Sequence, residues 1–211
     1  IVELDTAACL RAPARAAAGL LKSRPGIVGF SCYLWNVEAV MAVARALKKA
    51  APGVKVILGG PDVTGRGAQA LKDSGADILV SGEGELTFAD LLERYLAGEP
   101  WPGTPGTVAI SGGKAVQGPP RESITDLDII PSPYLAGLFD GGNYRRLVYE
   151  TSRGCPFKCD FCSWTSKGKP RYFSVERALA EAEWLVRHAP SPEGKGSTSF
   201  RRPDVIIADH D

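Results

Sequence analysis

Three cysteines lie close together in the last third of the chain, at Cys155, Cys159 and Cys162. They follow the strand-like segment 146–151 and are separated by three and then two residues. Thiolates are strong metal ligands, and four of them close a tetrahedral structural site. Three thiolates leave one coordination position open. The spacing therefore favours a metal cluster that can accept a further molecule, which is what catalysis needs.

Structural zinc and plain core cysteines are the simpler interpretations of this motif. Zinc normally takes four Cys or His ligands, but His188 and His210 do not have the spacing of a zinc-binding motif. A core segment fits poorly, because Pro156, Lys158 and Asp160 lie among the three thiols. A cubane iron–sulfur cluster with three protein thiolates and one accessible iron accounts for the motif better.

The composition is that of a globular protein. Of 211 residues, 44% are hydrophobic and 23% are charged, enough for one large domain or two small ones. The formal net charge of +1 does not indicate a nucleic acid partner, and the longest apolar stretch, residues 27–35, is too short to cross a membrane. Five cysteines, three of them clustered, argue against a disulfide framework. We therefore expect a cytoplasmic protein, with Cys9 and Cys32 as buried, inert thiols.

The first hundred residues alternate strand-like and helix-like segments. We expect strands at 1–4, 27–33, 54–58 and 78–80, and helices at 12–22, 37–50, 67–74 and 86–96. Asn36 is placed to cap the second of these helices. Apolar strands that alternate with helices predict a doubly wound parallel sheet covered on both faces. Ligands of such sheets bind beyond the carboxyl ends of the strands, here the loops 31–36, 59–64 and 81–85.

The rest of the chain divides at its proline-rich part. Residues 99–143 predict a connecting segment with a small hairpin over 107–117, between a first domain at 1–98 and a second at 144–211. The second domain is expected to contain a strand, the cysteine loop, a helix and a further strand, at 147–151, 155–162, 175–188 and 205–208.

The cysteine loop resembles that of the radical S-adenosylmethionine superfamily. The lead-in 151–156, Thr-Ser-Arg-Gly-Cys-Pro, and the aromatic Phe161 before the last cysteine both match. In that superfamily three cysteines hold a [4Fe-4S] cluster and S-adenosylmethionine chelates the fourth iron. The resemblance implies that Cys155, Cys159 and Cys162 hold the cluster, that Phe161 lies near the adenine, and that a 5′-deoxyadenosyl radical forms.

The first domain resembles the cobalamin-binding half of cobalamin-dependent radical S-adenosylmethionine proteins. The matching strings are residues 28–36, 58–63 and 81–88, and the connection 124–134 is also typical of them. The resemblance implies cobalamin contacts at Ser31, Tyr33, Gly59, Gly60, Gly82 and Glu83. It also implies a Rossmann/flavodoxin-like domain followed by the first βαβ portion of a partial (β/α)6 radical S-adenosylmethionine barrel.

The chain departs from the family at both ends. The Asp-x-His-x-x-Gly motif that supplies a histidine to cobalt is absent, and its place lies upstream of Ile1. The later barrel strands are absent as well. We therefore expect a fragment truncated at both ends, inactive by itself.

The implied activity of the full-length enzyme is methyl transfer to an unactivated carbon or phosphorus centre. Two alternatives stay open: a cobalamin-dependent cyclase or rearrangement enzyme, and a non-catalytic corrinoid or iron–sulfur binding module. The expected partners are a small-molecule or peptide substrate and an electron donor such as flavodoxin or ferredoxin, with no nucleic acid and no membrane. The sequence indicates no catalytic side chain.

Overall fold

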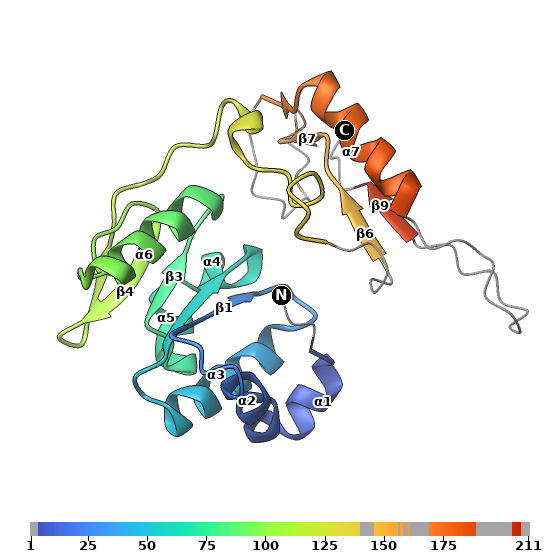
Figure 1. Ribbon diagram of the computed structural model, residues 1–211. Coiled ribbons are helices and arrows are strands. Elements are labelled where there is room, and N and C mark those ends of the chain that lie inside the picture. Colours follow the sequence, from blue (N-terminus) through green and yellow to red (C-terminus); the bar gives the residue numbers. More distant parts are fainter. Residues whose placement is uncertain are drawn as a thin grey trace, which may run out of the picture. The chain divides into compact units, whose positions relative to one another are not determined.

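The computed structural model describes residues 4–139, 146–155, 157, 160, 169–188 and 204–207; for 146 and 204–207 it describes the backbone alone. The chain forms two compact units, Ile1–Ser123 and Ile124–Asp211. Figure 1 shows the elements of each unit in the colours of the sequence. The domain boundaries expected at residues 98 and 143 stay predictions.

The first unit is built on one five-stranded sheet. Its strands are β1 (Ile27–Ser31), β2 (Lys55–Gly59), β3 (Ile78–Val80), β4 (Thr107–Ser111) and β5 (Lys114–Gln117), and they lie in that order. The first three are mutually parallel, as the alternation of strands and helices predicted. The expected small hairpin is confirmed as β4 and β5.

The sheet is mixed. The prediction of a parallel sheet holds for β1 to β3 and is wrong for β4 and β5, which are antiparallel. Strand β4 pairs antiparallel with β3, and Val80 stands opposite Thr107. The reason lies in residues 99–106, where Pro100, Pro102 and Pro105 cannot continue a helix. This segment returns the chain to the carboxyl end of β3, so the next strand must run in the opposite direction.

Helices cover both faces of the sheet (Figure 1). Helices α1 (Thr6–Arg11), α2 (Pro13–Leu21), α3 (Val37–Ala50) and α5 (Ala68–Ser74) lie on one face, and α6 (Glu85–Ala97) lies on the other. Alternation along β2 produces this arrangement, since successive side chains point to opposite faces. Val56 and Leu58 belong to the core under α3, whereas Ile57 packs in the core that contains Leu91 of α6.

Most expected helices are confirmed, and the differences have local causes. The helix expected at 37–50 is α3, but Asn36 makes no side-chain cap at its start. Helices α1 and α4 (Pro61–Arg66) were not predicted, because six residues are too few to show a helical period. Of the strand expected at 1–4, residues 1–3 lie outside the described residues, and Leu4 has no regular structure.

The second unit contains two pairs of strands and one long helix. Strands β6 (Arg146–Tyr149) and β9 (Asp204–Ile207) pair in parallel, and β7 (Ser152–Arg153) and β8 (Arg171–Tyr172) pair antiparallel. The expected helix at 175–188 is confirmed as α7 (Val175–His188), and the expected strands correspond to β6 and β9. The β7–β8 pair was not predicted, because two-residue strands carry no periodic signal.

The segment before β6 is fastened to the rest of this unit by polar contacts. It contains the short 3-10 helix η1 (Leu127–Ile129). Hydrogen bonds from the Ser174 side chain and from the Ser174 amide, the latter at 3.1 Å, lower the pKa of the Asp128 carboxyl. Arg177 of α7 donates to the Ile130 carbonyl oxygen and pairs with the buried Glu181 at 3.0 Å.

None of the helices in the described part of the chain is both long enough and apolar enough to span a bilayer.

Candidate cofactor-binding site

The predicted binding residues of the first unit converge on one edge of its sheet. Ser31 and Gly59 are the last residues of β1 and β2, and the sheet register places them directly opposite each other. Strand β3 ends beside them at Val80, and Gly82 and Glu83 follow in the next loop. Parallel neighbouring strands place their carboxyl ends together, so this edge is where such a sheet binds ligands.

The loops after β1 and β2 are locked together through Cys32 and Gly60. The Cys32 amide donates to the Gly59 carbonyl oxygen at 2.7 Å, and the Cys32 carbonyl oxygen accepts from the Asp62 amide at 3.4 Å. Gly60 has φ +108°, and a Cβ there would lie 2.5 Å from the Cys32 carbonyl oxygen. The fold itself therefore requires glycine at position 60.

Gly59 and Gly82 are different, because packing does not require glycine at either. A Cβ at Gly59 would meet only ordinary contacts, the nearest being the Val80 Cβ at 3.9 Å. A Cβ at Gly82 would have nothing within 4 Å, although its φ of +79° favours glycine. Both positions leave backbone without a side chain at the binding edge, half-buried at Gly59 and exposed at Gly82. That cradle fits a large cofactor that must approach the sheet closely.

An aromatic platform lies in the loop between β1 and α3. The rings of Tyr33 and Trp35 stack with centroids 4.6 Å apart and an interplanar angle of 4°. Leu34 and Trp35 are 82% and 72% exposed. The sequence analysis singled out Tyr33 but missed Leu34 and Trp35; two large apolar residues in a loop at the ligand-binding edge were the available signal.

The two isolated cysteines are buried, as predicted. Cys32 is fully buried and Cys9 is 5% exposed. Burial raises the pKa of Cys32 to about 11 and also raises the pKa of Cys9. A thiol with so high a pKa stays protonated at neutral pH and is a poor nucleophile or metal ligand. Cys32 thus acts through its backbone rather than its sulfur.

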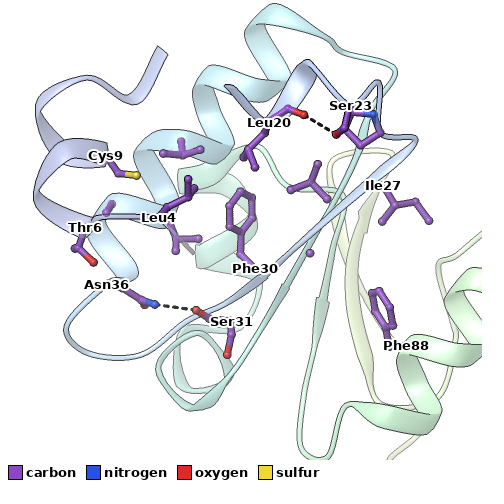
Figure 2. A pocket seen from close by; sticks show the side chains of 16 residues that line it. Leu4, Thr6, Cys9, Leu20, Ser23, Ile27, Phe30, Ser31, Asn36 and Phe88 are labelled. Carbon is purple, nitrogen blue, oxygen red and sulfur yellow. Dashed lines mark hydrogen bonds between the residues drawn. The ribbon is translucent and has the colours of Figure 1, made fainter. Parts of the chain in front are cut away.

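A largely apolar cavity of about 600 Å³ lies along β1 in the first unit. Figure 2 shows Phe30 and Leu4 facing it, with Ser31 and Asn36 at one end and Phe88 beyond the strand. Among the described residues, strand β1 is at the edge of the five-stranded sheet and pairs with β2. The cavity adjoins the predicted binding edge through Ser31.

The structure describes one of the three clustered cysteines. Cys155 is a free, half-buried thiol. It follows Gly154, which has φ +100° and where a Cβ would lie 3.2 Å from the Lys169 carbonyl oxygen. The other two cysteines and the adenine-contact residue lie outside the described residues: Cys159, Cys162 and Phe161.

The β7–β8 pair closes the base of the cysteine loop. Arg153 stands opposite Arg171 in the register, and the Phe173 amide donates to the Thr151 carbonyl oxygen at 3.0 Å. The described residues contain no group of three His, Cys, Asp or Glu side chains arranged to hold a metal ion.

The fold and this glycine-bearing edge define an α/β cofactor-binding domain of the Rossmann-like class. Residues 2–92 match the family model described as "B12 binding domain". These residues form a B12-binding domain, and the chain is homologous to cobalamin-dependent radical S-adenosylmethionine methyltransferases.

Two curated relatives and one solved structure support this assignment. The 2-(S-pantetheinyl)-carbapenam-3-carboxylate methyltransferase of Streptantibioticus cattleyicolor is 40% identical over 176 residues, covering 78% of this chain and 26% of the relative. The cobalamin-dependent radical SAM methyltransferase TokK of Streptomyces tokunonensis is 38% identical, with the same coverage. The cobalamin-dependent S-adenosylmethionine radical enzyme OxsB, solved with aqua-cobalamin and S-adenosylmethionine bound, has the same fold, with a TM-score of 0.67 and 21% sequence identity. The superposition covers 93% of this chain and 27% of that chain. The chain thus spans about a quarter of the length of the curated relatives it matches.

Proposed function

We propose that the first unit binds cobalamin at the carboxyl edge of β1, β2 and β3. One observation carries this proposal: within the B12-binding segment, an exposed serine and two open glycine positions lie on adjoining strand ends. Ser31 offers an exposed hydroxyl at the end of β1, and Gly59 offers half-buried backbone without a side chain of its own. A bulky cofactor with a polar tail needs both features.

Each predicted contact has a distinct role in this proposal. The hydroxyl of Ser31 donates to the polar tail of the cofactor, and Gly59 and Gly82 let it approach the backbone. Tyr33, with Trp35 stacked on it, covers an apolar face of the cofactor and excludes water. Gly60 acts indirectly by keeping the two loops together, and Glu83 lies at the β3 end of the same edge. Cobalamin, when bound, supplies a cobalt centre that can carry a methyl group.

The second unit, in this proposal, begins a radical S-adenosylmethionine barrel. Cys155, Cys159 and Cys162 would hold a [4Fe-4S] cluster, and Phe161 would lie beside the adenine of S-adenosylmethionine. The support is the motif spacing, the parallel β6–β9 pair with α7 between them in the chain, and the homology to radical S-adenosylmethionine methyltransferases. The domain extents 1–98, 99–143 and 144–211 are part of this proposal.

Methyl transfer is the reaction that the two relatives favour, and we propose an unactivated carbon or phosphorus centre as the methyl acceptor. Both curated relatives at 38–40% identity are methyltransferases. We propose that the whole protein, of which this chain supplies the cofactor-binding part, transfers a methyl group to a small-molecule or peptide substrate by way of a 5′-deoxyadenosyl radical. An electron donor such as flavodoxin or ferredoxin would reduce the cluster.

Cobalamin binding is tested by mixing the purified chain with hydroxocobalamin and separating free corrin by gel filtration. We expect visible corrin absorbance to co-elute with the chain at one equivalent. A Ser31→Ala variant should bind about fivefold more weakly, since one hydrogen bond to the cofactor is worth roughly 1 kcal/mol. A wild-type chain that elutes without corrin would contradict the proposal.

The cluster is tested by anaerobic reconstitution with iron and sulfide, followed by iron analysis and electron paramagnetic resonance of the reduced sample. The wild-type chain should contain four irons per protein and give a cubane signal. Cys155→Ala should lose that signal, whereas Cys9→Ala, the control at a buried cysteine outside the motif, should keep it. A normal cubane signal from Cys155→Ala would exclude this cysteine as a ligand.

A further inference from the structure

The Asn36 side chain forms hydrogen bonds with the loop before it and none with the helix after it. An asparagine directly before a helix usually accepts a hydrogen bond from one of the first free helical amides. Helix α3 has no such bond from Asn36. Instead, Asn36 Oδ1 accepts from the Tyr33 amide at 2.7 Å, and Asn36 Nδ2 donates to the Ser31 carbonyl oxygen at 3.0 Å. Figure 2 shows the second of these bonds at the end of β1.

The two bonds fix the orientation of the amide and explain why asparagine stands here. The Tyr33 N–H requires an acceptor, and the Ser31 carbonyl requires a donor. A side chain at position 36 must therefore present an acceptor and a donor, one at each end of a short planar group. Aspartate offers only acceptors, and alanine offers neither. The amide alone satisfies both ends of the loop.

The residues held by these bonds are two of the predicted cofactor contacts. Between them, Cys32 is tied to the loop after β2 through the Gly59 carbonyl oxygen. Ser31 and Tyr33 are the neighbours of Cys32 in the chain, and the Asn36 side chain links the two through its hydrogen bonds to both. The Tyr33 carbonyl oxygen in turn accepts from the amides of Asn36 and Val37 at 3.0 and 2.9 Å. Hydrogen bonds of the Asn36 side chain and backbone thus close loop 31–36 into one compact turn.

We propose that Asn36 is a positioning residue for the cofactor, which sets the Ser31 hydroxyl and the Tyr33 ring where the cofactor meets them. This inference rests on the proposed cobalamin function of the same edge. Asn36 itself bonds backbone atoms of the loop through both ends of its amide, so its effect on binding is transmitted through Ser31 and Tyr33.

The first test measures amide hydrogen exchange in the cofactor-free 211-residue chain. Asn36→Ala removes the acceptor of the Tyr33 amide, which should then exchange about tenfold faster or more. Asn36→Asp keeps an acceptor and should leave this amide protected. The matched control is Ser23→Ala, which removes a 3.0 Å bond from an exposed hydroxyl to the Leu20 carbonyl oxygen before β1. It should leave exchange at Tyr33 unchanged.

The second test is an equilibrium titration of the same variants with hydroxocobalamin. Asn36→Ala should bind about tenfold more weakly than wild type, because two loop hydrogen bonds are lost. Asn36→Asp should also bind more weakly, because the Ser31 carbonyl then faces an acceptor. Ser23→Ala should keep the wild-type dissociation constant.

The outcomes separate the positioning role from the cobalamin proposal. A folded Asn36→Ala variant with wild-type exchange at Tyr33, or with wild-type affinity, would overturn the positioning role while leaving cobalamin binding in place. If Asn36→Ala does not fold, Asn36→Asp decides, and wild-type affinity in that variant would overturn the role. A wild-type chain that binds no hydroxocobalamin overturns the cobalamin proposal, and with it the cofactor-positioning role of Asn36.

Discussion

The backbone of Gly60 lies against the backbone of Cys32, so closely that a Cβ at Gly60 would come within 2.5 Å of the Cys32 carbonyl oxygen and 2.8 Å of its nitrogen. This contact joins the loop after β1 to the loop after β2. Because both loops contribute predicted cofactor contacts, the arrangement of these contacts beyond the strand ends depends on it. The two glycines of the Gly59–Gly60 pair therefore have separate tasks.

Gly60→Ala should destabilise the fold. Its positive φ disfavours an L-residue by about 1–3 kcal/mol, and forcing a methyl group against the Cys32 backbone adds a cost of similar size. We expect the free energy of unfolding, measured by urea denaturation, to fall by about 2–6 kcal/mol. Gly53→Ala is the matched control, since a Cβ there meets nothing within 4 Å. A Gly60→Ala variant as stable as that control would contradict this packing.

Trp35→Ala should affect cofactor binding but not folding. The Trp35 side chain is 72% exposed, so its removal should change the free energy of unfolding by no more than about 0.5 kcal/mol. Loss of the ring that backs Tyr33 should weaken hydroxocobalamin binding about fivefold, since an aromatic contact with the apolar face of the cofactor is worth roughly 1 kcal/mol. Leu96→Ala, at an 84% exposed position on α6, should leave affinity unchanged. Equal affinities of both variants would exclude Trp35 from the site.

Stability should decrease at high pH through Cys32. Its pKa is raised from 9.0 to about 11 in the folded chain, mainly by burial. The folded state therefore holds the thiol proton more tightly than the unfolded state, and this contribution is complete below pH 9 and lost as pH rises to 11. It amounts to about 2–3 kcal/mol. Urea denaturation of wild type and Cys32→Ala between pH 8 and about pH 11 measures it. Parallel pH profiles of the two proteins would show that Cys32 does not titrate this way.

Asp77 should be important for the packing of β2 against α3. Its carboxylate accepts from the Val56 amide at 2.8 Å and from Lys48 of α3 at 3.0 Å, and Lys55 lies 3.6 Å away. Asp77→Ala should lower the free energy of unfolding by about 2–3 kcal/mol, because the Val56 amide loses its acceptor and the Lys48 ammonium, which keeps two carbonyl acceptors, loses its carboxylate partner. Asp73→Ala, at the exposed end of α5, is the control and should cost less than about 1 kcal/mol. Equal losses of unfolding free energy in Asp77→Ala and Asp73→Ala would contradict a special role of Asp77 in this packing.

Much of the first unit was predictable because its long elements carry strong periodic signals. The helical spacing of apolar residues over the fourteen residues of α3, and the apolar runs of β1 to β3, indicated these elements from the sequence alone. The direction of β4 was not predictable, because it depends on how residues 99–106 return along the sheet. The two-residue strands β7 and β8 are defined only by pairing with each other across the cysteine loop.

The predicted contacts of the first unit stay predictions as cofactor ligands; their place at one edge of the sheet could be anticipated from the sequence, and their internal contacts could not. Ser31, Gly59 and Gly82 stood out because they follow strands in an alternating pattern. The use of Asn36 could not be read from sequence, since an asparagine before a helix is an ordinary cap until its partners are seen. The requirement for glycine at position 60 likewise arises from Cys32, 28 residues earlier in the chain.

The most direct test of the account compares hydroxocobalamin affinity in Gly59→Ala and Gly53→Ala by equilibrium titration. Both substitutions add one methyl group where the cofactor-free chain has room: at Gly59 the nearest contact is 3.9 Å away, and at Gly53 nothing lies within 4 Å. We predict that both variants unfold within about 1 kcal/mol of wild type. Gly59→Ala should bind at least about tenfold more weakly, because its methyl group occupies the approach of the cofactor to β2, and Gly53→Ala should bind as wild type does. Equal, wild-type affinity in both variants would contradict a cobalamin site at the carboxyl edge of β1, β2 and β3.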